Sequence, residues 1–317
     1  MRFLAPAPES PVEAGPSPSI TVVVPCYQSA ATVGAAVRSA LDQSLPPHEV
    51  IVCDDGSTDD PAAALAAYGD RVRILRKANG GGASALNRGI AAASGDLVAI
   101  LDADDEYEVG RLEAIADLAA ERPDLDLVTT DAWLEQEGTR VGRYSDINPF
   151  VVSDQRAGIL DTCFVGGWPA IRRSRVIEAD GFDEKHSVAY DWECWIRLIF
   201  SGSSAGMVDA PLMTYRIHAG SLSANKAASL RDRLEMFRDV AAREDLSPHE
   251  RRVLEGSIRR DRRRLTAYEI ERAIAEPETA GALTGLALAP GAPVRSRLAA
   301  LRAAGGRIVR GRASRAP

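Results

Sequence analysis

Short runs of β-branched and aliphatic residues alternate with alanine-rich stretches through the first 130 residues of this chain. Runs such as Ile20–Pro25 and Glu49–Cys53 are typical of strands that are buried on both faces of a sheet. Strands are predicted at 20–25, 49–53, 72–75, 96–101 and 125–130, with helices at 30–43, after 59, at 82–93 and at 109–121. Strands that alternate with helices in this way form right-handed βαβ units. The predicted fold class is therefore α/β, with a doubly wound, mostly parallel sheet and helices on both of its faces.

Beyond residue 131 the alternation weakens and the composition changes. Residues 131–225 predict a mixed α+β region with one clear helix from about Asp191 to Phe200. From Lys226 the chain is predicted to be wholly helical, and Ser247-Pro-His-Glu250 matches a capping box at the start of a second helix. We expect a disordered, proline-rich tail at 1–18, a main domain at 19–225, a helical extension at 226–277 and a basic, partly disordered tail at 278–317.

Charge is distributed unevenly along the chain. Residues 1–225 contain 18 Lys and Arg against 33 Asp and Glu, whereas residues 226–317 contain 20 against 12. Phosphate backbones require a basic surface, so the acidic main domain argues against nucleic acid as a partner.

The basic C-terminal third has three interpretations. Five arginines lie between 259 and 264, and seven more follow Gly291. A basic segment of this kind can associate peripherally with an anionic membrane surface. Alternatively, it is a solvated helical face with a disordered tail, or the helices at 226–276 cover the main domain or form homodimer contacts.

Cysteine spacing and hydropathy bear on the compartment. The four cysteines are far apart and lack metal-site or redox spacing, which favours a reduced, intracellular chain. No apolar run reaches the roughly 18–20 residues that a membrane helix needs, and the N-terminus lacks a signal pattern. We expect a cytoplasmic protein, with peripheral contact at the inner membrane surface if the basic segment binds lipid.

Acidic residues follow two of the predicted strands at the point where each strand ends. Asp54-Asp55 follows the second strand, and Asp102-Ala-Asp-Asp105 follows the fourth. Ligands of open α/β sheets bind beyond these carboxyl ends, but the chain has neither a P-loop nor a dinucleotide-binding glycine motif. An anionic ligand at this acidic edge would need a divalent cation, for which oxygen ligands favour Mg²⁺ or Mn²⁺. The alternative for an isolated Asp-x-Asp is a solvated loop or a helix cap.

Several motifs occur in a characteristic order over about Ser19–Ser223. They are Val-Val-Val-Pro-Cys-Tyr at 22–27, Ser39–Ser44, Val52–Asp59, Asn79–Gly89, Gly95–Asp105, Gly181-Phe-Asp-Glu184, Tyr190–Leu198 and Tyr215–Ser223. Together these motifs make the chain resemble the inverting family 2 glycosyltransferases, which have the GT-A nucleotide-sugar-binding fold. The resemblance implies an inverting, metal-dependent hexosyltransferase of polysaccharide biosynthesis.

The resemblance also implies roles for residues on the donor side. Pro25, Tyr27 and Asp55 would hold the nucleotide base, and Asp102 would face the ribose. Asn87 would belong to the same nucleotide-sugar site.

Metal binding and catalysis would be supplied by three further residues. Asp104 would bind the Mn²⁺ or Mg²⁺ that bridges the diphosphate, with His218 close to it, and Asp191 would be the general base. The alternative is a structural role for Asp191 as an N-cap, because it lies at a predicted helix start.

Two tryptophans are candidates for the acceptor site. Trp168 lies in a glycine-containing loop, and Trp192 lies in the predicted helix 191–200. The alternative is a buried anchor for Trp168, and core packing for Trp192 because Trp192, Trp195, Ile196 and Ile199 form one helical stripe.

The substrates implied are a nucleoside-diphosphate sugar, with a leaning to UDP or dTDP, and a hydroxyl acceptor on a glycan, a lipid-linked molecule or a small molecule. Two departures from the family pattern bear on donor identity, because Leu86 replaces a common arginine and Tyr190 replaces a glutamate. Two other functions stay open. A nucleotidyltransferase would need a glycine-rich basic loop after the first strand, where the chain has Pro25-Cys-Tyr-Gln-Ser. The second is a non-catalytic subunit that binds a nucleotide sugar. The presence of Asp191 argues against it.

Overall fold

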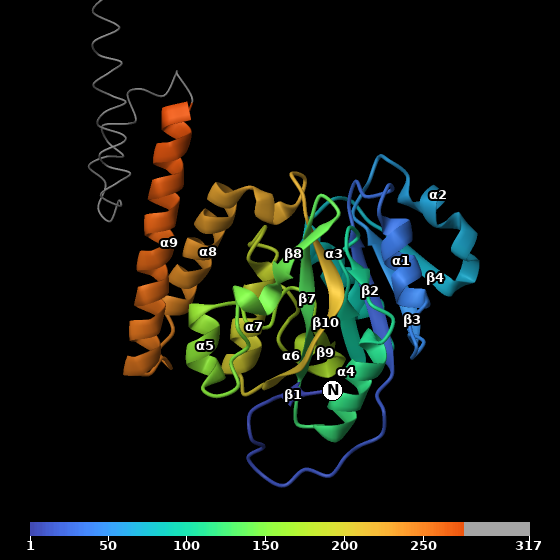
Figure 1. Ribbon diagram of the computed structural model, residues 1–317, viewed down its shortest axis with the longest axis horizontal. Helices are drawn as coiled ribbons and strands as arrows, with labels where there is room; N and C mark the ends of the chain where they lie inside the picture. Colours follow the sequence, from blue (N-terminus) through green and yellow to red (C-terminus); the bar gives the residue numbers. More distant parts are fainter. Residues whose placement is uncertain (276–317) are drawn as a thin grey trace, which may run out of the picture. The chain divides into compact units, whose positions relative to one another are not determined.

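The computed structural model describes residues 1–275 of the chain (Figure 1). The chain folds into two compact units, of which the first is Met1–Gly220 and the second begins at Ser221. Within residues 1–275, every strand belongs to the first unit, and the second unit is helical.

A mixed sheet forms the centre of the first unit, with the strand order β1-β10-β7-β9-β5-β2-β3-β4. Its strands are β1 (Phe3–Leu4), β2 (Ile20–Cys26), β3 (Glu49–Asp54), β4 (Val72–Arg76), β5 (Leu97–Ile100), β7 (Leu127–Gln136), β9 (Ala170–Arg172) and β10 (Ala205–Ile217), with β6 (Glu106–Tyr107) on β10 and β8 (Thr139–Arg143) on β7. Neighbours are parallel from β5 to β4 and between β7 and β10. Strand β9 is antiparallel to both β5 and β7, so it joins two parallel groups.

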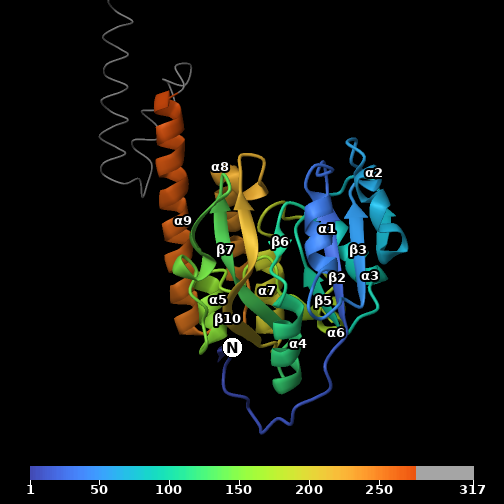
Figure 2. The same ribbon diagram turned by 45° about the vertical axis from the view of Figure 1, so that its right-hand side comes forward.

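Helices cover both faces of the parallel group. The helices of this unit are α1 (Val33–Leu41), α2 (Pro61–Leu65), α3 (Gly82–Ala92), α4 (Arg111–Glu121), α5 (Gln155–Asp161), α6 (Arg173–Glu178) and α7 (Tyr190–Phe200). Val22 and Val24 of β2 belong to the same buried cluster as the apolar face of α1, whereas a side chain at Gly89 of α3 would collide with Val23. Because successive strand residues point to opposite faces, α1 and α3 lie on opposite sides of the sheet (Figure 2). The predicted doubly wound fold is confirmed.

The structure differs from the prediction at the N-terminus. Within the stretch 1–18, for which we predicted disorder, Phe3–Leu4 forms β1 and pairs antiparallel with β10. Gly15 also donates its backbone N–H to the carbonyl of Ala120 at 2.8 Å. A strand of two residues has no periodicity that a sequence can reveal, and its pairing depends on a partner more than 200 residues away.

The second unit contains the short 3₁₀ turn Leu222–Ala224 and two helices that pack side by side, α8 (Lys226–Ala241) and α9 (Pro248–Ala275) (Figure 1). The predicted capping box is confirmed, since Ser247 N–H donates to Glu250 Oε2 and Glu250 N–H donates to Ser247 Oγ. Asp261 is fully buried and pairs with Arg233 of α8 at 2.6 Å. The predicted basic tail at 278–317 lies outside the described residues.

Over residues 1–275, no helix combines the length and the apolar character that crossing a membrane requires.

Candidate active site

The acidic loop after β5 contains three aspartates, Asp102, Asp104 and Asp105. Burial raises the pKa of Asp102 to about 7, and the negative charges of Asp104 and Asp191 contribute to this rise. The phenol of Tyr190 also has a pKa well above its ordinary value, chiefly through burial and then through the charges of Asp102, Asp191, Tyr215 and Asp104. Carboxylates affect a neighbour in this way only over short distances. The fold therefore brings Asp102 and Asp104 of the loop after β5 close to Asp191 of α7.

Residues at the end of β10, and His218 just beyond it, contact this acidic loop. His218, just beyond β10, lies with its Nε2 2.8 Å from Asp104 Oδ2. Arg216 donates its backbone N–H to Asp105 Oδ1 at 2.8 Å and its Nη1 to the Asp104 carbonyl at 3.0 Å. A further ion pair joins Arg216 Nη2 to Glu106 Oε1 at 2.8 Å. Arg216 therefore holds the loop in place next to His218. Arg216 lies in the Tyr215–Ser223 motif, which by itself indicates no role for this residue.

The donor atoms present here suit a hard divalent cation. Asp104 supplies carboxylate oxygens and His218 an imidazole nitrogen, which are ligands that Mn²⁺ accepts and, for the oxygens, Mg²⁺ prefers. Asp105 Oδ2 is buried without a hydrogen-bond partner among the described residues, and burial raises the pKa of this carboxyl well above its ordinary value. In the described part of the chain, no three acidic, histidine or cysteine side chains gather closely enough to hold a metal alone. A cation here would need further oxygens from a ligand, as is usual for Mg²⁺ bound with phosphates.

Asp55 follows β3 and is nearly buried, with 2% of its surface exposed. Its Oδ1 accepts from Lys77 Nζ at 2.7 Å, and its Oδ2 accepts from the Gly81 N–H at 2.7 Å. Gly80 N–H also donates to the same carboxylate, at 3.0 Å from Oδ1. In the structure, Asp55 therefore anchors the glycine-rich loop that leads into α3. The predicted partner of Asp55 was a nucleotide base, and a base N–H would have to share this carboxylate with the loop. Tyr27, which follows the last residue of β2, is 53% exposed.

Asp191 lies in the first turn of α7, where the alternative interpretation was a helix cap. The N-cap is Ala189, which makes no side-chain capping bond. Asp191 Oδ1 instead accepts from the backbone N–H of Trp192 at 2.7 Å. Its Oδ2 faces Gly167, because a Cβ built on Gly167 would lie 3.1 Å away from it. The carboxylate thus points toward the loop 166–168, and the positive end of the α7 dipole favours its charge.

Comparison with known proteins assigns the family. Residues 21–178 match the family described as "Glycosyl transferase family 2". The chain belongs to glycosyl transferase family 2. Asp191 and His218 lie outside the matched residues of this family 2 glycosyltransferase.

Individual relatives are consistent with this assignment. The chain is 26% identical over 230 residues to the putative teichuronic acid biosynthesis glycosyltransferase TuaG of Bacillus subtilis, which covers 70% of this chain and 88% of TuaG. Among solved structures, S. aureus TarS 1–349 in complex with UDP-GlcNAc has a TM-score of 0.64 at 18% identity, covering 88% of this chain and 82% of TarS. The mannosyltransferase PcManGT of Pyrobaculum calidifontis, in complex with GDP-Man and Mn²⁺, has a TM-score of 0.61 at 19% identity, covering 95% of this chain and 84% of PcManGT. Both structures share the fold of the family 2 glycosyltransferase.

The two tryptophans assigned to the acceptor site are buried in this glycosyltransferase. Trp168 is 4% exposed and donates its Nε1 to the Thr130 carbonyl at 3.2 Å. Trp192 is 6% exposed and donates its Nε1 to the Ile159 carbonyl at 2.7 Å. Neither indole presents a face on which a sugar could stack, so the placement supports the anchor and core interpretations instead.

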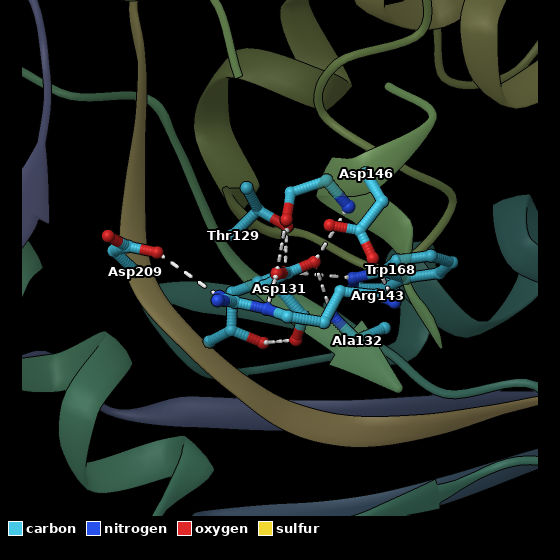
Figure 3. A network of polar contacts seen from close by, with 9 residues as sticks. Thr129, Asp131, Ala132, Arg143, Asp146, Trp168 and Asp209 are labelled. Carbon is cyan, nitrogen blue, oxygen red and sulfur yellow. Dashed lines mark hydrogen bonds and ion pairs between the residues drawn. The ribbon is translucent and has the colours of Figure 1, made fainter. Parts of the chain in front are cut away.

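A polar network lies beside Trp168, around Asp131 in the middle of β7 (Figure 3). Asp131 of β7 accepts from Arg143 Nε at 2.6 Å and from Ser145 Oγ at 2.6 Å, and Arg143 Nη2 reaches Asp209 at 3.1 Å. Figure 3 shows the Arg143 guanidinium between the two aspartates, with Trp168 beside the network. These contacts join β7, β8 and β10, so they stabilise this part of the sheet in the family 2 domain rather than expose a reactive group.

A fully buried arginine, Arg111, supports the loop 166–168 of the glycosyltransferase. Its Nη2 donates to the Trp168 carbonyl at 2.6 Å, and its Nη1 contacts Thr130 Oγ1. The guanidinium lies 4.6 Å from the ring centre of Tyr107. Sequence reasoning missed Arg111, because an arginine in the first turn of a helix is ordinarily exposed and carries no signal of burial.

Proposed function

We propose that this glycosyltransferase moves a sugar from a nucleoside-diphosphate sugar to an acceptor hydroxyl and inverts the anomeric configuration. The observation that carries the proposal is the proximity of Asp191 in α7 to Asp102 and Asp104 in the loop after β5, where His218 Nε2 also lies 2.8 Å from Asp104 Oδ2. A group of three carboxylates is costly unless a ligand or a cation uses their charge.

Asp191 is the proposed general base. Its carboxylate accepts the proton of the acceptor hydroxyl, while the acceptor oxygen forms a bond to the anomeric carbon. The bond from that carbon to the diphosphate oxygen breaks, and the diphosphate leaves with the electron pair. A single in-line displacement of this kind inverts the configuration. The Trp192 N–H donates to Oδ1 of this carboxylate at 2.7 Å, and Oδ2 faces Gly167.

The leaving-group side is assigned to Asp104 and His218, which would hold Mn²⁺ or Mg²⁺. When bound, the cation supplies Lewis-acid stabilisation of the departing diphosphate. Arg216 keeps the Asp104 backbone in position. The Mn²⁺ in the PcManGT structure supports the choice of cation.

The donor side is assigned to residues at the ends of β2, β3 and β5. Pro25, Tyr27 and Asp55 would contact the base, and Asp102 would face the ribose. The UDP-GlcNAc bound to TarS supports a nucleotide sugar as ligand, and the name of TuaG supports polysaccharide biosynthesis. A uridine or thymidine donor is proposed, with a glycan, lipid-linked or small-molecule hydroxyl as acceptor.

Thermal unfolding in the presence of nucleotide sugars tests this proposal. With Mn²⁺, a UDP- or dTDP-sugar at about 100 times its Kd is expected to stabilise the protein by about 2.7 kcal/mol. With the best donor and an acceptor, the enzyme should release the nucleoside diphosphate. The NMR coupling constant of the product's anomeric proton then reports whether the configuration is inverted. Stabilisation without turnover over a panel of acceptors would favour the non-catalytic binding subunit. A product that retains the anomeric configuration would contradict the mechanism.

For the second unit we infer peripheral binding to an anionic lipid surface. Arginines are exposed along α9, at Arg251, Arg252, Arg259, Arg262, Arg263 and Arg264. Three acidic residues lie in the same stretch: Glu250 and Asp261 are buried, and the exposed Glu255 pairs with Arg259 at 3.5 Å. The six exposed arginines therefore outnumber the acidic residues that can offset their charge. Each basic residue near anionic lipid contributes about 1 kcal/mol.

Sedimentation with liposomes tests the inference. Changing Arg259, Arg262 and Arg263 to Gln is expected to weaken binding to anionic vesicles about 10²-fold at low salt, from about 1 kcal/mol per residue. Neutral vesicles and a variant with Arg38, Arg71 and Arg73 changed to Gln are the controls. Deleting 291–317 tests the predicted role of the tail, which lies outside the described residues. Equal sedimentation of the wild type and the α9 variant would contradict the inference. Light scattering of both proteins without vesicles tests the alternative, a homodimer.

A further inference from the structure

We propose that Asn87 is a positioning residue that fixes α7, and with it Asp191, rather than a ligand of the nucleotide sugar. The inference rests on the proposed role of Asp191 as general base. It corrects the donor-side role that the family resemblance implied for Asn87.

Both polar atoms of the Asn87 side-chain amide form hydrogen bonds. Asn87 Nδ2 donates to the Phe182 carbonyl at 2.9 Å, and Phe182 N–H donates to Asn87 Oδ1 at 2.8 Å. A second contact runs from Nδ2 to Glu184 Oε1 at 3.2 Å. The amide thus pairs with one backbone residue as a neighbouring strand would. Only a side chain with a donor and an acceptor side by side can do this.

The turn that Asn87 holds is bound to α7 on its other side. Arg197 of α7 donates its Nη2 to the Gly181 carbonyl at 2.6 Å, and Cys194 Sγ lies 3.7 Å from the same oxygen. Phe182 is 2% exposed, and its ring packs edge-on against Trp195 at 5.6 Å. The turn is therefore a rigid connection between α3 and α7.

The same two helices meet again next to Asp191. The hydroxyl of Tyr190, the first residue of α7, lies close to Gly82, because a Cβ built on Gly82 would be 2.8 Å from it. Phe182 also contacts the Tyr190 ring edge-on at 6.0 Å. Helix α3 thus touches α7 at Tyr190, and Asn87 fixes the turn that precedes it. Loss of the Asn87 contacts should let the Asp191 carboxylate move relative to the donor side.

Replacement of Asn87 separates the two roles. In Asn87→Ala, the Phe182 N–H and carbonyl lose their partners, and we expect kcat to fall on the order of 10²-fold, as a displacement of about 1 Å can cause. The Kd for UDP with Mn²⁺, from calorimetry, should be unchanged. Ala91→Ser, at an exposed site on the same helix, is the control. A weakened Kd with an unchanged kcat would show that Asn87 binds the donor and would overturn the inference.

A second variant approaches the contact from the other side. Gly181 has φ +70°, and a Cβ there would collide with Asn87 Oδ1. Gly181→Ala should lower kcat as Asn87→Ala does, and in the Asn87→Ala background it should cost less because that collision is gone. Strictly additive losses in the double variant would contradict the proposed coupling.

A failure of the inference about Asn87 can be distinguished from a failure of the proposed function. If Asp191→Asn is inactive but Asn87→Ala keeps full kcat, only the inference about Asn87 fails. If Asp191→Asn retains full activity, the proposed function of Asp191 fails first.

Discussion

Asp191→Asn is expected to reduce the rate of sugar transfer about 10²–10⁴-fold, the usual contribution of general-base assistance. The amide has nearly the shape of the carboxylate and can still accept the Trp192 N–H, but it cannot take up the proton of the acceptor hydroxyl. We expect the fold and nucleotide binding to survive, because the N-cap of α7 is Ala189 and not Asp191.

Steady-state transfer with the best donor and acceptor measures this effect, and circular dichroism and calorimetry report folding and UDP binding. Asp117→Asn is a matched control, because it makes the same change at an exposed position of α4. Full transfer activity in Asp191→Asn would refute the assignment of the base. A loss equal to that of Asp117→Asn would refute it as well.

Asp104→Ala is expected to lower the transfer rate by about 10²-fold or more, because losing a Lewis acid withdraws several kcal/mol of transition-state stabilisation. The same variant should lose the extra thermal stability that Mn²⁺ gives to the UDP-bound wild type. His218→Ala should have a smaller effect in the same direction, since it leaves the carboxylate of Asp104 in place.

Glu108→Gln, at the end of the same acidic run, is the control for the loss of one negative charge. Chelation of the wild type with EDTA should reproduce the Asp104→Ala rate, and Mn²⁺ should restore only the wild type. If Asp104→Ala keeps both its rate and its response to Mn²⁺, the metal role of Asp104 is wrong.

Much of the fold could be predicted because its signals are local. The strand at Glu49–Asp54 and the helix at Tyr190–Phe200 were predicted to within about one residue. Strands β1 and β9 were not predicted, because runs of two or three residues have no period of their own. Their structure depends on partners that are distant in sequence.

The site was predicted less evenly than the fold. The position of Asp102 and Asp104 follows from the end of a buried strand, which a sequence reveals. The burial of Trp192 does not follow from sequence, because an apolar stripe on a helix looks the same whether it faces the core or the rim of a site. Trp168 lies in a loop, and its burial depends on contacts with segments that are distant in sequence, such as Thr130. Asn87 was assigned to the donor by motif alone, and its contacts with Phe182 could not have been read from residues 95 positions apart.

The order of strands and helices, and the acidic ends of β3 and β5, are properties of the sequence by itself, because periodicity and strand ends are encoded over a few neighbouring residues. Only the tertiary structure decided that Asp191 faces Gly167, that Arg216 holds the acidic loop and that Asn87 binds the turn before α7. A polar side chain has several groups with which it can form hydrogen bonds equally well. Which of them it meets is set by how distant segments pack, and that packing is a property of the whole fold.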